Sequence, residues 1–228
     1  MAALFMVFLL VAFLVTDIIY RRVIAKKVMV EAPAVERIPI PFDLQLEKLA
    51  LPGGLFFHQG HTWAKLDTTG NVKVGLDDFV QKIIGRIDGI KPRKVGDSIF
   101  QGDKLFTIQQ GKRKADFNSP VDGVIDSINE EIVTNPKAIK ENPYEMGWIY
   151  SIKPTNLPTN IKSLSIAEDA LAWLKKEVQK FREFIAEQFV SDKMLGKTLA
   201  DGGVPVEGVM EHMDDFSWMK LQEEFLAK

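Results

Sequence analysis

The chain has no cysteine and only three histidines among its 228 residues. The lack of cysteine excludes disulfide bonds, thiolate metal sites and a cysteine nucleophile, and it suits a reducing compartment. Neither sign of charge is in large excess, because 29 Lys and Arg residues stand against 31 Asp and Glu residues. The resulting net charge of -2 does not indicate a nucleic-acid partner, and we expect none.

Motifs for catalysis and nucleotide binding are also lacking. The sequence contains no phosphate-binding Gly-Lys-Ser and no dinucleotide-binding glycine fingerprint. His58 and His61 have the spacing of a metal-binding pair on a helix, but Gly60 and the following Thr-Trp indicate a loop that enters a strand. Helix capping and solvation explain the paired carboxylates at 77–78 and 130–131. We therefore expect no metal site, no enzyme and no small-molecule substrate.

A long apolar run opens the chain. Residues 1–20 carry a single charge, Asp17, and are long enough to cross a hydrocarbon core of about 30 Å as a helix. Asp17 either pairs with Arg21 at the interface or contacts another membrane helix. No basic residue precedes the run, whereas Arg21, Arg22, Lys26 and Lys27 follow it. The positive-inside rule then predicts a single-pass inner-membrane protein with its N-terminus outside, its soluble domain in the cytoplasm and the lipid bilayer as a partner.

Composition divides the chain into four segments. We predict a transmembrane helix with a basic flank at 1–27, a Pro-rich tether at 28–57, a β-rich domain at 58–157 and an α-helical extension at 158–228. Within the tether, residues 44–51 have room for one short helix.

The β-rich segment consists of short alternating strands. Residues 62–66 and 71–75 alternate around Asp-Thr-Thr-Gly, which predicts a hairpin. Asp77 or Asp78 can cap a short helix that ends at Gly85. Turn signals then recur about every eight to twelve residues, as is typical of a compact β unit.

Helical periodicity dominates the extension. Ser165 and Glu168 fit a capping box that begins a helix. Apolar residues then recur at steps of three and four: Leu171, Leu174, Val178, Phe181 and Ile185. A last short amphipathic helix carries Trp218, Leu221 and Phe225 on one side. Such stripes are most often core or docking faces, so we expect Phe181 and Trp218 to be buried on the β unit or to bind a partner.

Five motifs occur in order between about residues 57 and 157. They are GHTW at 60–63, VGLDDFVQKIIG at 74–85, VGD at 95–97, SPVDGVIDSIN at 119–129 and NPYEMGWIYSIKP at 142–154. In order and spacing they resemble the glycine cleavage system H protein family of lipoyl carriers, here in a membrane-anchored variant. The resemblance implies a mainly β fold with α, a barrel-sandwich hybrid that displays a modified lysine on a hairpin turn.

The resemblance also implies a modified residue. Aligned back from Ser-Pro at 119–120, the lipoyl-lysine of the family falls on Lys112, so lipoate is the implied cofactor. The family typically has Glu-Ser-Val before this lysine and small residues after it. This chain has Gln-Gln-Gly at 109–111 and then Arg113 and Lys114. An enzyme that recognises charge and shape around the lysine therefore meets a different surface.

Two functions follow from this departure. The first is a non-catalytic structural or adaptor subunit of a membrane-associated complex, in which Lys112, Arg113 and Lys114 contact other protein subunits. The alternative is a lipoyl carrier of the glycine cleavage type, whose lipoate on Lys112 swings between partner active sites. The membrane span, tether and helical extension favour the adaptor, because they are additions to the soluble carrier.

Overall fold

The computed structural model of the chain describes residues 49, 51–191 and 208–226, which all belong to the second of its two units, Pro41–Lys228. Among these residues, no helix is both long enough and apolar enough to cross a bilayer. The predicted span at 1–20 and most of the predicted tether at 28–57 lie outside the described residues. Both remain predictions.

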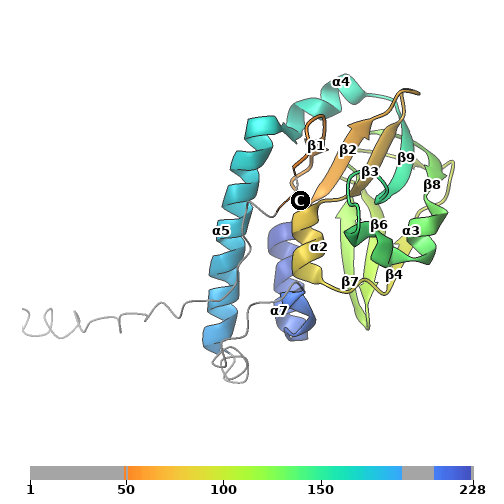
Figure 1. Cartoon of the computed structure of the whole chain (residues 1–228). Coiled ribbons are helices and arrows are strands. Elements are labelled where there is room, and N and C mark those ends of the chain that lie inside the picture. The colour runs from red at the N-terminus through yellow and green to blue at the C-terminus, as the bar shows by residue number, and fades with distance from the viewer. Residues whose placement is uncertain (1–48, 50, 192–207, 227–228) are drawn as a thin grey trace, which may run out of the picture. The chain divides into compact units, whose positions relative to one another are not determined.

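Two antiparallel sheets form the β-rich part of the chain (Figure 1). The larger has the strand order β10-β1-β2-β3-β9-β8-β5, and the smaller has the order β4-β6-β7. The strands are β1 (Phe56–Phe57), β2 (Thr62–Leu66), β3 (Val72–Leu76), β4 (Gly89–Pro92), β5 (Ser98–Ile99), β6 (Lys104–Gln110), β7 (Arg113–Asn118), β8 (Gly123–Ile128), β9 (Trp148–Pro154) and β10 (Ser165–Ile166). This arrangement confirms the predicted mainly β domain with helices.

The predicted hairpin is β2 and β3, and its turn is held by Asp67. The Asp67 Oδ1 accepts from the backbone N–H groups of Thr69 at 2.8 Å and Asn71 at 3.1 Å. Trp63 of β2 is fully buried over Gly75 of β3, where an added Cβ would lie 2.7 Å from the indole. Only glycine fits at this close approach, so the Trp and Gly of two separate motifs form one packing unit.

Helices and helical turns connect and cover the sheets. They are α2 (Asp78–Ile84), α3 (Glu130–Thr134), η2 (Pro136–Lys140), α4 (Leu157–Asn160), η3 (Ile161–Ser163), α5 (Ala167–Ser191), η4 (Val209–Glu211), α7 (Asp215–Leu221) and η5 (Gln222–Leu226). The predicted helix after β3 is α2. Its N-cap is Asp77, which accepts from the Val80 N–H at 2.9 Å, and it ends at Gly85 with a φ of 81°.

The capping box predicted at Ser165 is wrong. Ser165 pairs with Phe57 between β10 and β1, and α5 begins two residues later at Ala167. A cap at Ser165 would require the helix to begin at Ile166, but Ile166 pairs with Phe56 of β1 and is still part of the strand. The last two residues of the predicted tether, Phe56 and Phe57, are thus a strand of the larger sheet.

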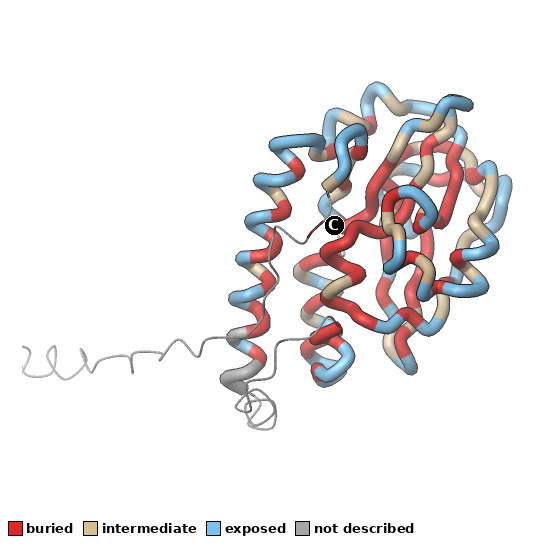
Figure 2. Tube along the Cα trace, viewed as in Figure 1, coloured by how far each residue is buried: buried red, intermediate tan, exposed pale blue. Residues whose placement is uncertain are grey.

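One face of α5 is buried on the chain itself. Phe181 is 0% exposed, and its ring centroid lies 5.7 Å from those of Phe79 on α2 and Phe225 on η5. Figure 2 shows buried residues along one side of α5 and through α2, β2 and β3. The predicted stripe is confirmed with one correction: Leu171 is 39% exposed, whereas Leu174 is 3% exposed. At about 100° per residue, Leu171 falls at the margin of the stripe.

Candidate functional site

A two-residue turn joins β6 to β7 and carries Lys112. Gln110 pairs with Arg113 across the hairpin, which leaves Gly111 and Lys112 as the loop. Gly111 has a φ of 58°, a conformation that glycine adopts readily at the first central position of such turns. Lys112 is exposed, and its side chain makes no hydrogen bond or ion pair within the described residues. Its Nζ is accessible for a reaction.

The base of this turn is tied to the segment that follows α2. The backbone N–H of Gly111 donates to Asp88 Oδ2 at 2.7 Å, and Asp88 forms an ion pair with Arg86 at 2.8 Å. Gln110 is buried, and its Nε2 donates to the carbonyls of Ile84 and Arg86, both at 2.7 Å. These bonds hold the two residues before Lys112 in place, so the turn is displayed on a rigid support.

Residues 208–226, here the C-terminal segment, bind the residue after Lys112. The Arg113 guanidinium donates to three acceptors of this segment: Asp215 Oδ1 at 2.8 Å, Met210 O at 3.0 Å and Met213 O. Trp218 lies beside it, with the guanidinium carbon 5.6 Å from the ring centroid, and its Nε1 donates to Lys114 O at 2.9 Å. The C-terminal segment therefore forms hydrogen bonds with the first two residues of β7, Arg113 and Lys114.

The three consecutive bases have different surroundings. Lys112 is exposed at the turn, Arg113 is engaged within the chain, and Lys114 presents its side chain to solvent. Phe181 and Trp218, which we predicted at a partner interface, are 0% and 4% exposed through contacts within the chain. These contacts account for their burial, and partner binding by any of the five remains a prediction.

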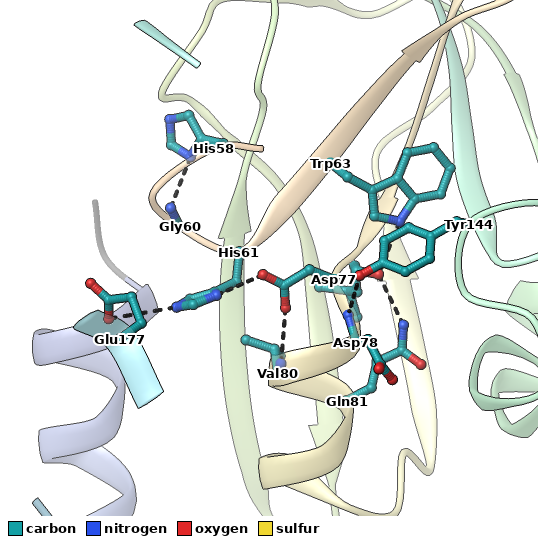
Figure 3. A network of polar contacts seen from close by, with 11 residues as sticks. His58, Gly60, His61, Trp63, Asp77, Asp78, Val80, Gln81, Tyr144 and Glu177 are labelled. Carbon is teal, nitrogen blue, oxygen red and sulfur yellow. Dashed lines mark hydrogen bonds and ion pairs between the residues drawn. The ribbon is translucent and has the colours of Figure 1, made fainter. Parts of the chain in front are cut away.

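A second polar cluster lies in the interior, where β2 begins (Figure 3). The His61 Nδ1 is 2.7 Å from Asp77 Oδ2, and its Nε2 is 3.9 Å from Glu177 Oε2 of α5. The imidazole is 0% exposed, and its centroid lies 4.9 Å from that of Phe79 and 5.0 Å from that of Trp173. Enclosed in this way, His61 links β2, α2 and α5 and does not reach an external substrate.

Two groups beside this cluster, Tyr144 and His58, are held in their neutral forms. The Tyr144 hydroxyl accepts from the Asp78 N–H at 3.0 Å, and burial, with the charge of Asp77, raises the pKa of Tyr144 well above its usual value. His58 Nδ1 accepts from the Gly60 N–H at 3.0 Å. Burial first, and then the charge of His61, lower the pKa of His58 to about 4.

Sequence reasoning found the turn but missed this interior cluster. The sequence predicted only a helix-capping role for Asp77. Nothing in the sequence around Glu177 distinguishes it from any other charged residue of a helix. Within the residues that the structure describes, no group of three or more His, Cys, Asp or Glu side chains is arranged to hold a metal ion. The arrangement is that of an internal anchor.

A family model described as glycine cleavage H-protein matches residues 55–177. This match covers more than half of the chain and contains both the hairpin and the interior cluster. The chain belongs to the glycine cleavage H-protein family. Members of this family are lipoyl carriers rather than catalysts, carry lipoate on a lysine and interact with other glycine cleavage proteins.

Two relatives, compared by sequence, give the same result. A probable glycine cleavage system H protein of Pyrococcus horikoshii is 35% identical over 122 residues, which are 54% of this chain and 90% of that protein. The glycine cleavage system H protein of Listeria monocytogenes serotype 4a is 32% identical over 121 residues, which are 53% of this chain and 95% of that protein. The crystal structure of an H protein from Mycobacterium marinum is 23% identical, with a TM-score of 0.47 over 56% of this chain and 98% of that one.

The family match ends within α5. Glu177 is its last residue, so the His61 anchor lies inside the matched part of the chain. The C-terminal segment, with every group that binds the Arg113 guanidinium, lies outside it. This chain therefore combines an H-protein domain with an additional segment that packs beside the Lys112 turn.

Proposed function

We propose that the protein is a lipoyl carrier of the glycine cleavage type, with lipoate joined through an amide to Nζ of Lys112. The observation that carries this proposal is the position of Lys112: an exposed lysine, without a partner among the described side chains, on a rigid two-residue turn of an H-protein domain. A lysine at the tip of a tight turn offers its amine to a modifying enzyme without unfolding the strands beside it.

The residues around Lys112 fit such a role. Gly111 allows the turn, Asp88 and Gln110 hold its first side, and Arg113 holds its second side. The lysine stem remains flexible, so an attached group can move while its anchor point does not. Lipoate supplies, when bound, a dithiolane that accepts and passes on the transferred group, and a carrier of this kind acts by raising effective concentration.

We further propose that the carrier is anchored to the inner membrane. Residues 1–20 have the length and apolarity of a single span, and the basic residues that follow favour a cytoplasmic domain. Anchoring would confine the lipoyl group to the membrane surface and raise its concentration near a membrane-bound partner.

A second candidate function is the adaptor subunit without a cofactor. Two observations favour it: Gln-Gln-Gly precedes Lys112 instead of the acidic family pattern, and the C-terminal segment binds Arg113 beside the turn. In that case the turn would serve protein contact only, and Lys112 would stay unmodified.

The mass of the native protein separates the two functions. A carrier isolated from its own cells has the mass of the chain plus one lipoyl group, located on Lys112 by peptide mapping. In Lys112→Arg the positive charge remains but the attachment point is lost, so the added mass and the carrier activity should both disappear. The matched control is Lys114→Arg, which changes an exposed lysine two residues away and should retain both.

The opposite result is equally clear. If native material has the mass of the bare chain under conditions in which other lipoyl proteins of the same cells are modified, the carrier proposal is wrong. The adaptor function is then the remaining proposal, and Lys112→Arg should leave assembly and activity almost unchanged.

A further inference from the structure

A basic groove runs along the outer face of the smaller sheet. It has a volume of about 420 Å³ and is lined by residues of β4, β6 and β7 and by Arg93. Five of its ten lining residues are charged: Lys91, Arg93, Lys104, Lys114 and Asp116. Four cations thus face a single carboxylate, although the chain as a whole has a net charge of -2.

The single carboxylate is already neutralised. Asp116 lies 2.7 Å from Lys104 Nζ and accepts from the Thr107 hydroxyl at 2.7 Å. Partial burial opposes ionisation, but these two bonds and the charges of Lys104 and Lys114 hold the pKa of Asp116 below its usual value. Among the described residues, no carboxylate forms an ion pair with Lys91, Arg93 or Lys114. The groove therefore keeps a surplus of positive charge.

The groove and the C-terminal segment lie on opposite faces of the hairpin. Successive side chains of a strand point to opposite faces, so Lys114 faces the groove while Arg113 faces the C-terminal segment. The pair Gln109 and Lys114 borders the groove, whereas the side chains of the next pair, Gln110 and Arg113, bond to groups within the chain on the other face. A partner that approaches Lys112 thus finds one face occupied and the basic face open.

We propose that this groove is the docking site for an acidic surface of the partner protein that meets Lys112. The inference deepens the proposed carrier function by naming the charge of its partner. Lys114 is two residues from Lys112, at most about 7 Å along the chain, so a protein seated on the groove also contacts the turn. The acidic residues of the partner would pair with Lys91, Arg93 and Lys114 and steer its approach.

The lining favours a protein over other anions. Small-molecule sites are lined mainly by apolar and aromatic side chains, whereas half of the lining residues here are charged. A bilayer surface is flat and would touch only the rim of a concave site. Carboxylate side chains that project from a protein reach into the groove and pair with cations on both of its sides.

The test is a binding titration with a defined acidic probe. Hexaglutamate peptide is added to the full-length, ¹⁵N-labelled chain in a non-ionic detergent, and amide shifts are followed. We expect shifts at Lys91, Gln109 and Lys114, with an affinity that falls as salt rises from ~0.05 to ~0.5 M. In the variant Lys91→Glu with Lys114→Glu, affinity should fall at least roughly tenfold.

The matched control reverses the same number of charges elsewhere. Lys137→Glu with Lys140→Glu changes two exposed lysines of η2 and should keep the wild-type response at the groove. Amide shifts far from each substitution report whether the variants fold. If Lys91→Glu with Lys114→Glu does not fold, Lys91→Gln with Lys114→Gln replaces it, with a smaller loss expected.

Three outcomes would overturn the proposal. They are equal binding of hexaglutamate by the wild type and the groove variant, a groove response to phosphatidylglycerol mixed into the detergent micelles but not to the peptide, and a response to inorganic phosphate alone. Lys112→Arg, which lacks the attachment point, should bind the peptide normally. The two proposals can therefore be rejected separately. A native protein without lipoate that still binds the peptide rejects only the carrier function. A lipoylated protein that does not bind the peptide rejects only the docking groove.

Discussion

Two histidines at the entrance to β2 show how strongly local surroundings decide the behaviour of one residue type. His61 is enclosed between Asp77 and Glu177, whereas His58 lies three residues earlier and accepts a hydrogen bond from the Gly60 N–H. An imidazole nitrogen that accepts a hydrogen bond must be unprotonated. The neutral form of His58 is therefore part of the folded loop.

The lowered pKa of His58 predicts that the folded chain loses stability in acid. Its pKa is about 4 in the folded chain and 6.5 for the free side chain, so the unfolded state binds the proton first as the pH falls. The contribution of His58 to stability is present above pH 6.5 and is lost as the pH falls toward 4. Between about pH 7.5 and about pH 4.5 we expect a loss of roughly 2 kcal/mol from this group.

Urea unfolding at several pH values checks this contribution. Buried carboxylates add their own pH dependence, so the informative quantity is the difference between variants. His58→Asn should flatten the dependence in this range, while the control His212→Gln, at an exposed histidine, should not. Identical pH profiles for His58→Asn and the wild type would remove His58 as the titrating group.

At the scale of elements, α5 is attached to the domain by one face only. Leu174 and Leu171 are the same residue type, three positions apart on the same helix, but they are 3% and 39% exposed. Removal of a buried leucine side chain loses its transfer free energy and leaves a cavity, whereas removal of a half-exposed one loses much less.

Replacement by alanine should therefore destabilise the chain much more at Leu174 than at Leu171. Leu174→Ala should lower the free energy of unfolding by about 2 to 4 kcal/mol, and Leu171→Ala by less than about 1 kcal/mol. Chemical denaturation of both variants measures the difference, and helix propensity cancels because the substitution is the same. Equal losses would mean that α5 does not pack on the domain in this register.

The C-terminal segment is a second element whose attachment can be tested. Arg113 reaches one carboxylate and two backbone carbonyls, but Asp215 is 90% exposed, so the ion pair alone contributes little. The carbonyls of Met210 and Met213 depend on the planar guanidinium fork, which lysine does not supply. Most of the attachment should come from these carbonyl bonds.

We expect replacement of Arg113 to lower the free energy of unfolding more than replacement of Asp215 does. Asp215→Asn should cost less than about 1 kcal/mol, whereas Arg113→Lys, which keeps the charge, should cost about 1 to 3 kcal/mol. Limited proteolysis gives the local readout: faster cleavage within 208–226 in Arg113→Lys than in Asp215→Asn. Similar cleavage of both variants would assign the attachment to Trp218 and the apolar contacts instead.

At the scale of the whole molecule, the question is on which side of a membrane the domain lies. The basic cluster after residue 20 predicts that everything from about His58 onward is cytoplasmic. Protease added to intact spheroplasts should therefore leave the domain uncut, and detergent should make it accessible. Cleavage of the domain before detergent is added would reverse the assigned orientation, and recovery of the chain in the soluble fraction would argue against the span.

Local sequence determined the features that depend on neighbours in the chain. Alternation around Asp67 predicts the hairpin of β2 and β3, Asp77 predicts the start of α2, and glycine before Lys112 suits the turn that displays it. The periodic stripe of α5 is equally local, and it predicted the buried face except at its margin. These features follow from the conformational preferences of a few adjacent residues, so a single sequence contains enough information to find them.

The contacts that set this chain apart were decided only by the tertiary structure. Arg113 and Asp215 are 102 positions apart, Thr62 bonds to Asn118 across 56 positions, and Ser165 pairs with Phe57 instead of capping a helix. The basic groove likewise combines lysines of three strands, none of which is unusual alone. The physical reason is that such partners meet only after the strands and helices have packed, and no local preference specifies which distant surface will be there.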